Sequence, residues 1–364
     1  MIDNYELVLK IINAAIKGEH LDLSNQHENK ELLITMKEQT FLAYLYYVSK
    51  DPFFNPYYIS SCLIHEQFKN FATLIKSLFD KNDIDHIFLK GSTMQYLYPD
   101  KNLRMLGDID VLVREKDINR ACELLKENGF IFQDRADHHI GFQYKKLEFE
   151  LHNRIIEYTH PLHDYLKDPF SHAYKKDNNT YALEDNFNFI YILSHYMKHL
   201  KNGSGIRSLI DVYLLLTKTN IDLDYCYEIF KKYGYEDFFK VSMTALKRIF
   251  NYENKYQVSK YADDLITYSL NSGIHGFGKN NDYVKNKQVS TSNNKFIYLL
   301  KVLFVPIPTL FSYYPWTKSI ILIPFGYIAR FFHLLFKRHD KFKHVLHSAK
   351  QDDQFFKNIG IKND

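Results

Sequence analysis

The segment from Asp108 to Val113, which reads DIDVLV, constrains the fold of this chain more than any other. Its β-branched and apolar residues predict a strand that is partly buried. Successive side chains of a strand point to opposite faces, so Asp108 and Asp110 share one face and lie within about 7 Å of each other. Carboxylates this close repel each other unless a cation lies between them. Because oxygen ligands favour magnesium or manganese, we expect Mg²⁺ (or Mn²⁺) here.

A short apolar run from His86 to Leu89 lies just upstream and leads into Lys90, Gly91 and Ser92. A segment typical of a helix follows, so we predict a strand, a tight turn and a helix. A glycine in such a turn lets the backbone approach a ligand closely, and the free amides at the start of a helix favour an anion. Gly91 and Ser92 are therefore candidate phosphate-binding residues.

A third carboxylate is normally needed when two metal ions act together. The segment from Leu147 to Arg154 alternates, with apolar residues on one face and Glu148, Glu150 and His152 on the other. The two glutamates have the same parity, so the pattern leaves open which of them faces the aspartates. A plain solvent-exposed face is the alternative for both.

The composition excludes several classes of function. A mean hydropathy of −0.35 excludes a polytopic membrane protein. The 47 basic and 43 acidic residues give a formal net charge of +4, too small for a broad nucleic-acid-binding surface, so duplex nucleic acid is not an expected partner. Cys62, Cys122 and Cys226 are too widely spaced for a zinc knuckle or a redox motif. The first residues show no secretory pattern, and we predict a cytoplasmic protein.

Several of these elements together resemble a known family, the uncharacterised nucleotidyltransferases of the DNA polymerase beta superfamily. That family carries a Leu-Lys-Gly turn, a Tyr-Pro pair, an Arg before an Asp-x-Asp strand, and a later acidic-x-His element. The matching elements here are Leu89–Ser92, Tyr98-Pro99, Arg104, Gly107–Val113 and Glu150–His152. The likeness continues through a helical His and Gly-x-Arg region to a proline-interrupted tail, and so covers roughly residues 87–336.

The resemblance implies roles for the matching residues. Gly91 and Ser92 would bind the nucleotide phosphates, while Asp108, Asp110 and Glu150 would hold the metals. Glu148 is the alternative to Glu150. The wider superfamily has a shorter spacing than the fifteen residues between Ser92 and Asp108, and it has an apolar residue in place of Lys90. Both features fit the smaller family.

Three basic residues are candidates for nucleotide binding. Lys90 and Arg104 are placed to hold phosphate charge, Arg104 through its fork of donors, and ion pairs with nearby aspartates are the alternative. Arg207, with His195, His199 and Asp211, is expected to line a cleft between the two halves, where Arg207 would contact a phosphate. A hydrogen-bond network between packed helices is the alternative for this group.

The histidines give little sign of a zinc enzyme. His195 and His199 are four residues apart and share a helix face, but Tyr196 replaces the glutamate that a metalloprotease needs. His138 and His139 are adjacent, so they would not share a face of a strand. We expect His138 and His139 to be surface residues in an exposed turn.

The periodicity as a whole predicts an α+β fold, a small mixed β-sheet with N-terminal helices and a C-terminal all-α domain. We expect a helical lead-in over residues 1–82 that packs across the back of the sheet, a nucleotidyltransferase core over 83–185, and a helical domain with an apolar, proline-interrupted tail over 186–364. Residues 275–294 are expected to form a flexible loop.

Residues 296–343 combine aromatic and basic side chains but contain no uninterrupted apolar span of membrane length. Two arrangements fit this pattern. One is a helical hairpin packed on the domain, and the other is peripheral contact with an anionic membrane surface.

The resemblance and the residues together predict a metal-dependent nucleotidyltransferase. It would move a nucleoside monophosphate from an NTP to a hydroxyl or phosphate acceptor and release pyrophosphate. ATP is the expected nucleotide on grounds of abundance, and the acceptor stays open among small molecules, sugar phosphates, peptides and proteins. The alternative is a catalytically inactive nucleotide- or partner-binding module in a biosynthetic assembly, which would have no need of three converging carboxylates.

Overall fold

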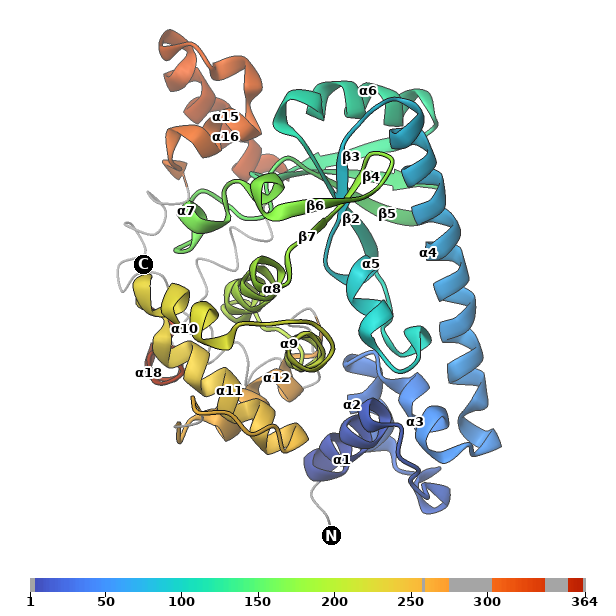
Figure 1. Ribbon diagram of the computed structural model, residues 1–364. Helices are drawn as coiled ribbons and strands as arrows, with labels where there is room; N and C mark the ends of the chain where they lie inside the picture. The colour runs from blue at the N-terminus through green and yellow to red at the C-terminus, as the bar shows by residue number, and fades with distance from the viewer. Residues whose placement is uncertain (1–3, 257–258, 275–302, 338–352, 363–364) are drawn as a thin grey trace.

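The computed structural model describes residues 4–256, 259–274, 303–337 and 353–362 (Figure 1). Within these residues, one seven-stranded sheet has the order β3-β4-β5-β2-β1-β7-β6. β2 pairs in parallel with β5, and β1 with β7, whereas the other neighbours are antiparallel. The predicted α+β class with a mixed sheet is confirmed. The strands are β1 (His86–Phe88), β2 (Asp108–Val113), β3 (Ile131–Arg135), β4 (His139–Tyr144), β5 (Leu147–His152), β6 (Ala173–Asp177) and β7 (Thr180–Leu183).

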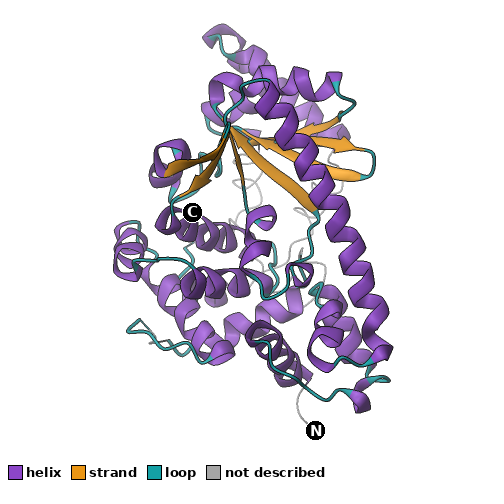
Figure 2. Ribbon diagram, turned by 45° about the vertical axis from the view of Figure 1, so that its right-hand side comes forward, coloured by secondary structure: helices purple, strands orange, loops and turns teal. Residues whose placement is uncertain are grey.

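Two helices, α4 (Asn55–Lys81) and α6 (Ile118–Glu127), cover one face of this sheet. α4 runs along the side of the sheet in both ribbon views (Figures 1 and 2). Its apolar residues share a core with Ile109, Val111 and Val113 of β2. Because side chains of a strand alternate, this packing directs Asp108 and Asp110 toward the opposite face.

The first three helices are α1 (Asn4–Lys17), α2 (Lys30–Glu38) and α3 (Leu42–Ser49). Their buried residues belong to the same apolar core as the C-terminal helices, and α1 packs against α11 (Glu236–Phe250). Gln39, just after α2, also donates to the carbonyls of Ser269 and Leu270. The prediction that the N-terminal helices pack across the sheet is therefore correct for α4 but wrong for α1–α3. The apolar faces of α1–α3 are buried against other helices.

The C-terminal helical domain begins where the sheet ends. The short α7 (His163–Leu166) precedes the β6–β7 hairpin, which sequence analysis did not predict because its residues are largely polar. The predicted domain boundaries after residues 82 and 185 lie beside the ends of α4 and β7, and they stay predictions. The helices that follow are α8 (Asp185–Leu200), α9 (Arg207–Lys218), α10 (Leu223–Lys232), α11 (Glu236–Phe250), α12 (Ala262–Ser272) and α18 (Asp353–Asn358).

A helical hairpin, formed by α15 (Ile307–Tyr313) and α16 (Ile323–Lys337), lies beside the sheet end of the molecule (Figure 1). A Cβ on Gly326 would come 3.1 Å from Leu310 Cδ2 of α15, so the glycine lets the two arms of the hairpin approach closely. Among the described residues, no helix has the length and apolar character needed to cross a membrane. The predicted loop at 275–294 lies outside the described residues, as do 296–302 and 338–343.

A buried ion pair joins the segment before β2 to α9. Arg104 Nε donates to Asp211 Oδ1 and its Nη2 to Asp211 Oδ2, each at 2.9 Å. Tyr98 donates a further hydrogen bond of 2.7 Å to Asp211 Oδ1. All three side chains are buried, so loss of the Asp211 charge would leave Arg104 without compensation.

Candidate active site

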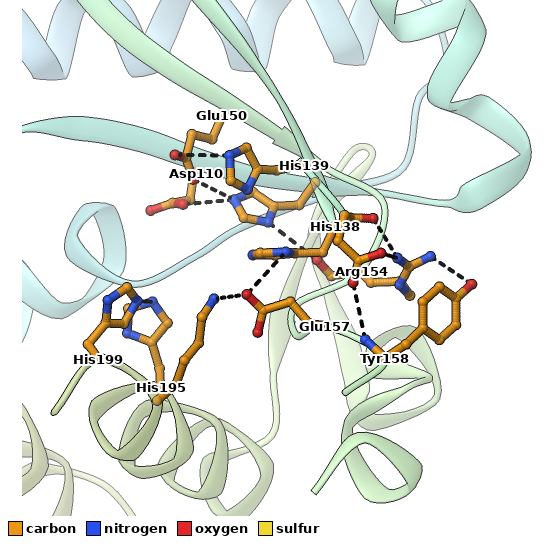
Figure 3. Close-up of polar contacts among 12 residues, drawn as sticks. Asp110, His138, His139, Glu150, Arg154, Glu157, Tyr158, His195 and His199 are labelled. Carbon is orange, nitrogen blue, oxygen red and sulfur yellow. Dashed lines mark hydrogen bonds and ion pairs between the residues drawn. The ribbon is translucent and has the colours of Figure 1, made fainter. Parts of the chain in front are cut away.

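The pairing of β2 with β5 assembles the acidic residues. The two strands run parallel in a register that sets Asp108 opposite Glu148 and Asp110 opposite Glu150. All four side chains share the parity that faces away from α4 and α6. Lys90 reaches the same place from the turn after β1. The sheet therefore brings the predicted acidic residues and Lys90 to one face. Figure 3 shows Asp110 and Glu150 on this face, above the helix that carries His195 and His199.

Asp110 lies at the centre of a charge network. It is 3% exposed. Its Oδ1 atom lies 2.6 Å from Lys90 Nζ and 2.8 Å from His152 Nε2. Burial alone would raise the pKa of Asp110, but Lys90 and His152 outweigh it and hold that pKa well below its usual range. Burial likewise disfavours the charged form of Lys90, yet the Asp110 carboxylate raises the pKa of Lys90 above its usual value. Asp110 is thus ionised and paired.

Asp108 has the opposite environment. Burial, followed by repulsion from Asp110, raises the pKa of Asp108 to about 7, although Lys90 partly offsets the effect. No ion-pair partner of Asp108 is found among the residues that the structure describes. This carboxyl therefore lacks a positive charge of its own, a deficit that a bound cation would remove.

The two candidate third carboxylates differ in their surroundings. Glu150 Oε2 lies 3.2 Å from His152 Nε2, and its Oε1 lies 3.4 Å from His139 Nε2. Asp110, Glu150 and His152 each offer a ligand atom within 4.8 Å of the others. Glu148 is exposed, and among the described residues no such group includes it. The geometry favours Glu150.

The turn after β1 is strained at Lys90. Its φ of 48° and ψ of −123° are those of a turn position that glycine usually fills, at a cost of about 1–3 kcal/mol for other residues. Gly91 has a packing role, because a Cβ there would lie 2.8 Å from Leu106 Cδ2. Ser92 donates its hydroxyl to the carbonyl of Leu89 at 2.7 Å. Phosphate binding by Gly91 and Ser92 would therefore use backbone amides, and it stays a prediction.

The two candidate arginines lie side by side behind the carboxylates. Arg104 forms an ion pair with Asp211. An ion pair was the alternative role that sequence analysis gave for Arg104, but with an aspartate nearby in the sequence. Arg207 donates from Nη1 to the carbonyl of Met105 at 3.0 Å. Burial and the neighbouring Arg104 lower the pKa of Arg207 to about 10. Asp211 pairs with Arg104, while the positive charge of Arg207 acts on Asp108.

One face of α8 contributes Tyr191, which sequence analysis did not assign to the site, beside His195 and His199, which it expected to line a cleft. Tyr191 is fully buried, and the charges of Lys90 and Asp110 act on its hydroxyl. His195 and His199 follow at four-residue steps, with their Nε2 atoms 3.0 Å apart. Burial and His199 lower the pKa of His195 well below its usual value. The spacing of 191, 195 and 199 was the available signal.

His138 and His139 are not surface residues, contrary to the prediction. His138 is 6% exposed, and its ring packs against the rings of His139 and His152. The alternation argument was wrong because β4 begins only at His139. His138 precedes the strand, so the two rings need not point to opposite faces.

Comparison with known proteins agrees with this arrangement. A family model described as uncharacterised nucleotidyltransferase matches residues 65–251, just over half of the 364-residue chain. The chain belongs to this family. The family resemblance noted from the sequence is thereby confirmed up to residue 251, and the resemblance of the tail beyond it stays a prediction. Membership supports a general nucleotidyl-transfer activity. No curated protein and no solved structure matches the chain.

The residues present fit the divalent metal that nucleotidyltransferases generally use. Asp108, Asp110 and Glu150 supply the oxygen ligands that Mg²⁺ prefers. Asp108 in particular is partly buried beside a second carboxylate and has a raised pKa, and a divalent cation would favour its ionised form. The identity of the metal stays a prediction.

Replacement of Asp108 by Asn should stabilise the metal-free protein at alkaline pH. The folded-state pKa of about 7 exceeds the ordinary 3.8, so the folded state loses stability as pH rises from about 4 to 7. The penalty above pH 7 is at most about 4 kcal/mol. In chelator, Asp108→Asn should melt several degrees above the wild type at pH 8, with little difference at pH 4.5. Thermal melts monitored by circular dichroism measure this.

Asp211→Asn is the matched control, because it leaves Arg104 unpaired. We expect it to lower the melting temperature at both pH values. An Asp108→Asn protein that melts below the wild type at pH 8 would contradict the electrostatic description of the site.

Proposed function

We propose that this nucleotidyltransferase moves a nucleoside monophosphate from an NTP to a hydroxyl or phosphate acceptor and releases pyrophosphate. The observation that carries the proposal is the in-register pairing of β2 with β5, which sets Asp110 beside Glu150 on the face where Asp108 also lies. Three acidic residues on one face, within the region that the family model covers, are what metal-dependent phosphoryl chemistry needs.

Each residue of the site has a distinct task in this proposal. Asp108, Asp110 and Glu150 hold Mg²⁺ (or Mn²⁺), which when bound polarises the α-phosphate and neutralises the leaving pyrophosphate. Lys90 keeps Asp110 ionised and presents an ammonium group beside the phosphates. Arg207 adds positive charge on the Asp108 side. When the acceptor is a hydroxyl group, its oxygen attacks the α-phosphorus, and Glu150 or Asp110 takes up the hydroxyl proton.

The acceptor enters on the α8 side, where Tyr191 and His195 border the carboxylates. Tyr191 Oη is buried and has no hydrogen-bond partner among the described residues. Its neutral form is favoured, because burial raises the pKa of Tyr191. A neutral hydroxyl suits an acceptor that is an uncharged or phosphorylated small molecule.

We propose ATP as the nucleotide donor, on grounds of cellular abundance.

We also propose that the α15–α16 hairpin, residues 303–337, contacts an anionic membrane surface. These residues include Lys318, Arg330 and Lys337 but no aspartate or glutamate. Exposed apolar side chains are concentrated here, with Ile321 75% and Phe325 57% exposed. Basic residues among exposed aromatics suit the interface of an anionic bilayer. The other exposed apolar residues are Phe304, Ile307, Trp316, Ile328, Phe331 and Phe332.

Pyrophosphate release should depend on Asp110 and Glu150 but not on Glu148. Incubation with each α-labelled NTP, Mg²⁺ and a cell extract should yield labelled product and pyrophosphate with the wild type. Asp110→Asn and Glu150→Gln should each lower the rate by about 100-fold or more, since each removes charge stabilisation from the transition state.

Glu148→Gln is the matched control and should retain most of the activity. Circular dichroism should confirm that every variant folds. Equal label transfer by wild type and Asp110→Asn would refute the catalytic proposal. Specific NTP binding without any transfer would favour the binding-only module instead.

The hairpin should bind vesicles through its exposed apolar residues. The wild type should float with phosphatidylcholine vesicles that contain phosphatidylserine, but not with phosphatidylcholine alone. Phe325→Ser/Ile328→Ser should lose flotation, because both side chains are exposed on α16 and would enter the interface. Ile131→Ser/Tyr174→Ser is the control, since it removes comparably exposed residues from the sheet. The wild type remaining with the non-floating fraction at low salt would rule out membrane contact.

A further inference from the structure

Three histidines form a cluster next to the carboxylates, and the proposed transfer reaction does not use it. His138 precedes β4, His139 begins β4, and His152 ends β5 (Figure 3). His139 and His152 are direct neighbours across the β4–β5 pair. The three ring centroids are 4.8, 5.2 and 5.6 Å apart. Each ring therefore contacts the other two.

The spacing of the rings matches that of imidazoles around one metal ion. Each histidine offers a ring nitrogen within 4.8 Å of those of the other two. Tetrahedral coordination at Zn–N distances of about 2.0–2.1 Å puts the centroids of three imidazoles on the order of 5 Å apart. Small side-chain rotations would therefore bring three nitrogens onto a common ion.

Some ring nitrogens of this cluster are without a good hydrogen-bond partner. Nδ1 of His138 and Nδ1 of His139 have no hydrogen-bond partner among the described residues. The carboxylate nearest to His138 Nδ1 is Glu157 at 3.9 Å, beyond hydrogen-bond range. His152 Nδ1 has only a long contact of 3.3 Å with the carbonyl of Arg154. A buried imidazole nitrogen without a partner costs free energy that a metal–nitrogen bond would recover.

The Nε2 atoms of His139 and His152 lie beside carboxylates, as in known metal sites. Nε2 of His152 lies 2.8 Å from Asp110 Oδ1, and Nε2 of His139 lies 3.4 Å from Glu150 Oε1. A metal-binding histidine usually donates its second ring N–H to a carboxylate or a carbonyl, which fixes the tautomer and the orientation of the ring. The catalytic carboxylates would serve here as those outer partners.

The segment that carries His138 is fixed in place. Arg154 donates from Nη2 to the carbonyl of Asp137 and, at 3.2 Å, to its Oδ1. The backbone amide of Asn153 donates to the carbonyl of His138 at 3.2 Å. The loop is thus tied to the end of β5, so that His138 stays beside His152.

We propose that His138, His139 and His152 bind a transition-metal ion of the Zn²⁺, Co²⁺ or Fe²⁺ class, at a site distinct from the Mg²⁺ carboxylates. Imidazole nitrogens favour these ions, whereas Mg²⁺ favours oxygen. The ion orients His139 and His152, which in turn fix Glu150 and Asp110. This site does not depend on the identity of the transfer reaction.

Co²⁺ titration of the chelator-stripped full chain tests the site, with excess Mg²⁺ present to occupy the carboxylates. One equivalent of Co²⁺ should produce the intense visible absorption of four-coordinate cobalt, and Zn²⁺ should displace it. His138→Ala and His139→Ala should each weaken Co²⁺ binding by about 100-fold or more, since loss of an outer partner alone costs roughly 10- to 100-fold.

Two controls separate this site from the catalytic one. His160→Ala removes another buried histidine and should leave the Co²⁺ spectrum unchanged. Asp108→Asn should also leave it unchanged, even if transfer activity is lost. An unchanged spectrum in His138→Ala, or a spectrum lost in Asp108→Asn, would overturn the proposal.

X-ray absorption at the zinc edge on the wild-type protein decides the question if the histidine variants do not fold. Scattering from three imidazoles supports the site. A shell of oxygen ligands alone, or no tight binding of Zn²⁺ or Co²⁺, overturns it.

Discussion

The parallel, in-register pairing of β2 with β5 is the interaction on which the site depends. It sets Asp110 beside Glu150, while the packing of Ile109 and Val111 against α4 and α6 turns the acidic side chains to the other face. A shift of this register by one residue would move every acidic side chain of β5 away from Asp110. The apolar core behind β2 therefore maintains the geometry of the polar site in front of it.

The two aspartates of the site differ in how far their charges are neutralised, and this difference favours ligand binding. Asp110 is neutralised by Lys90, which is held in a backbone conformation that normally requires glycine. Asp108 has no ion-pair partner within the described part of the chain, and nearby Arg104 is paired with Asp211. A cation bound between the carboxylates would neutralise their negative charge. Phosphate groups near Lys90 and Arg207 would neutralise the positive charge of these two side chains. The free protein thus stores unfavourable electrostatic energy that substrate and metal would relieve.

The sequence predicted the local parts of this arrangement better than the long-range ones. The alternation around Asp108 and Asp110 was sufficient to predict their strand and their common face. It was insufficient to choose between Glu150 and Glu148, because both have the same parity and only their surroundings in the folded chain distinguish them. Asp211, the partner of Arg104, lies 107 residues away and left no local signal. His138 was misjudged because the start of β4 was not predictable to one residue.

X-ray diffraction from crystals soaked with Mn²⁺ and an unreactive triphosphate analogue is the most direct test of the central claim. Anomalous scattering at the manganese edge locates the ion independently of the protein atoms. We predict a peak bounded by Asp108, Asp110 and Glu150, with the triphosphate toward Lys90 and Gly91. A well-ordered analogue without manganese at these carboxylates, or manganese bound only elsewhere, would contradict the account.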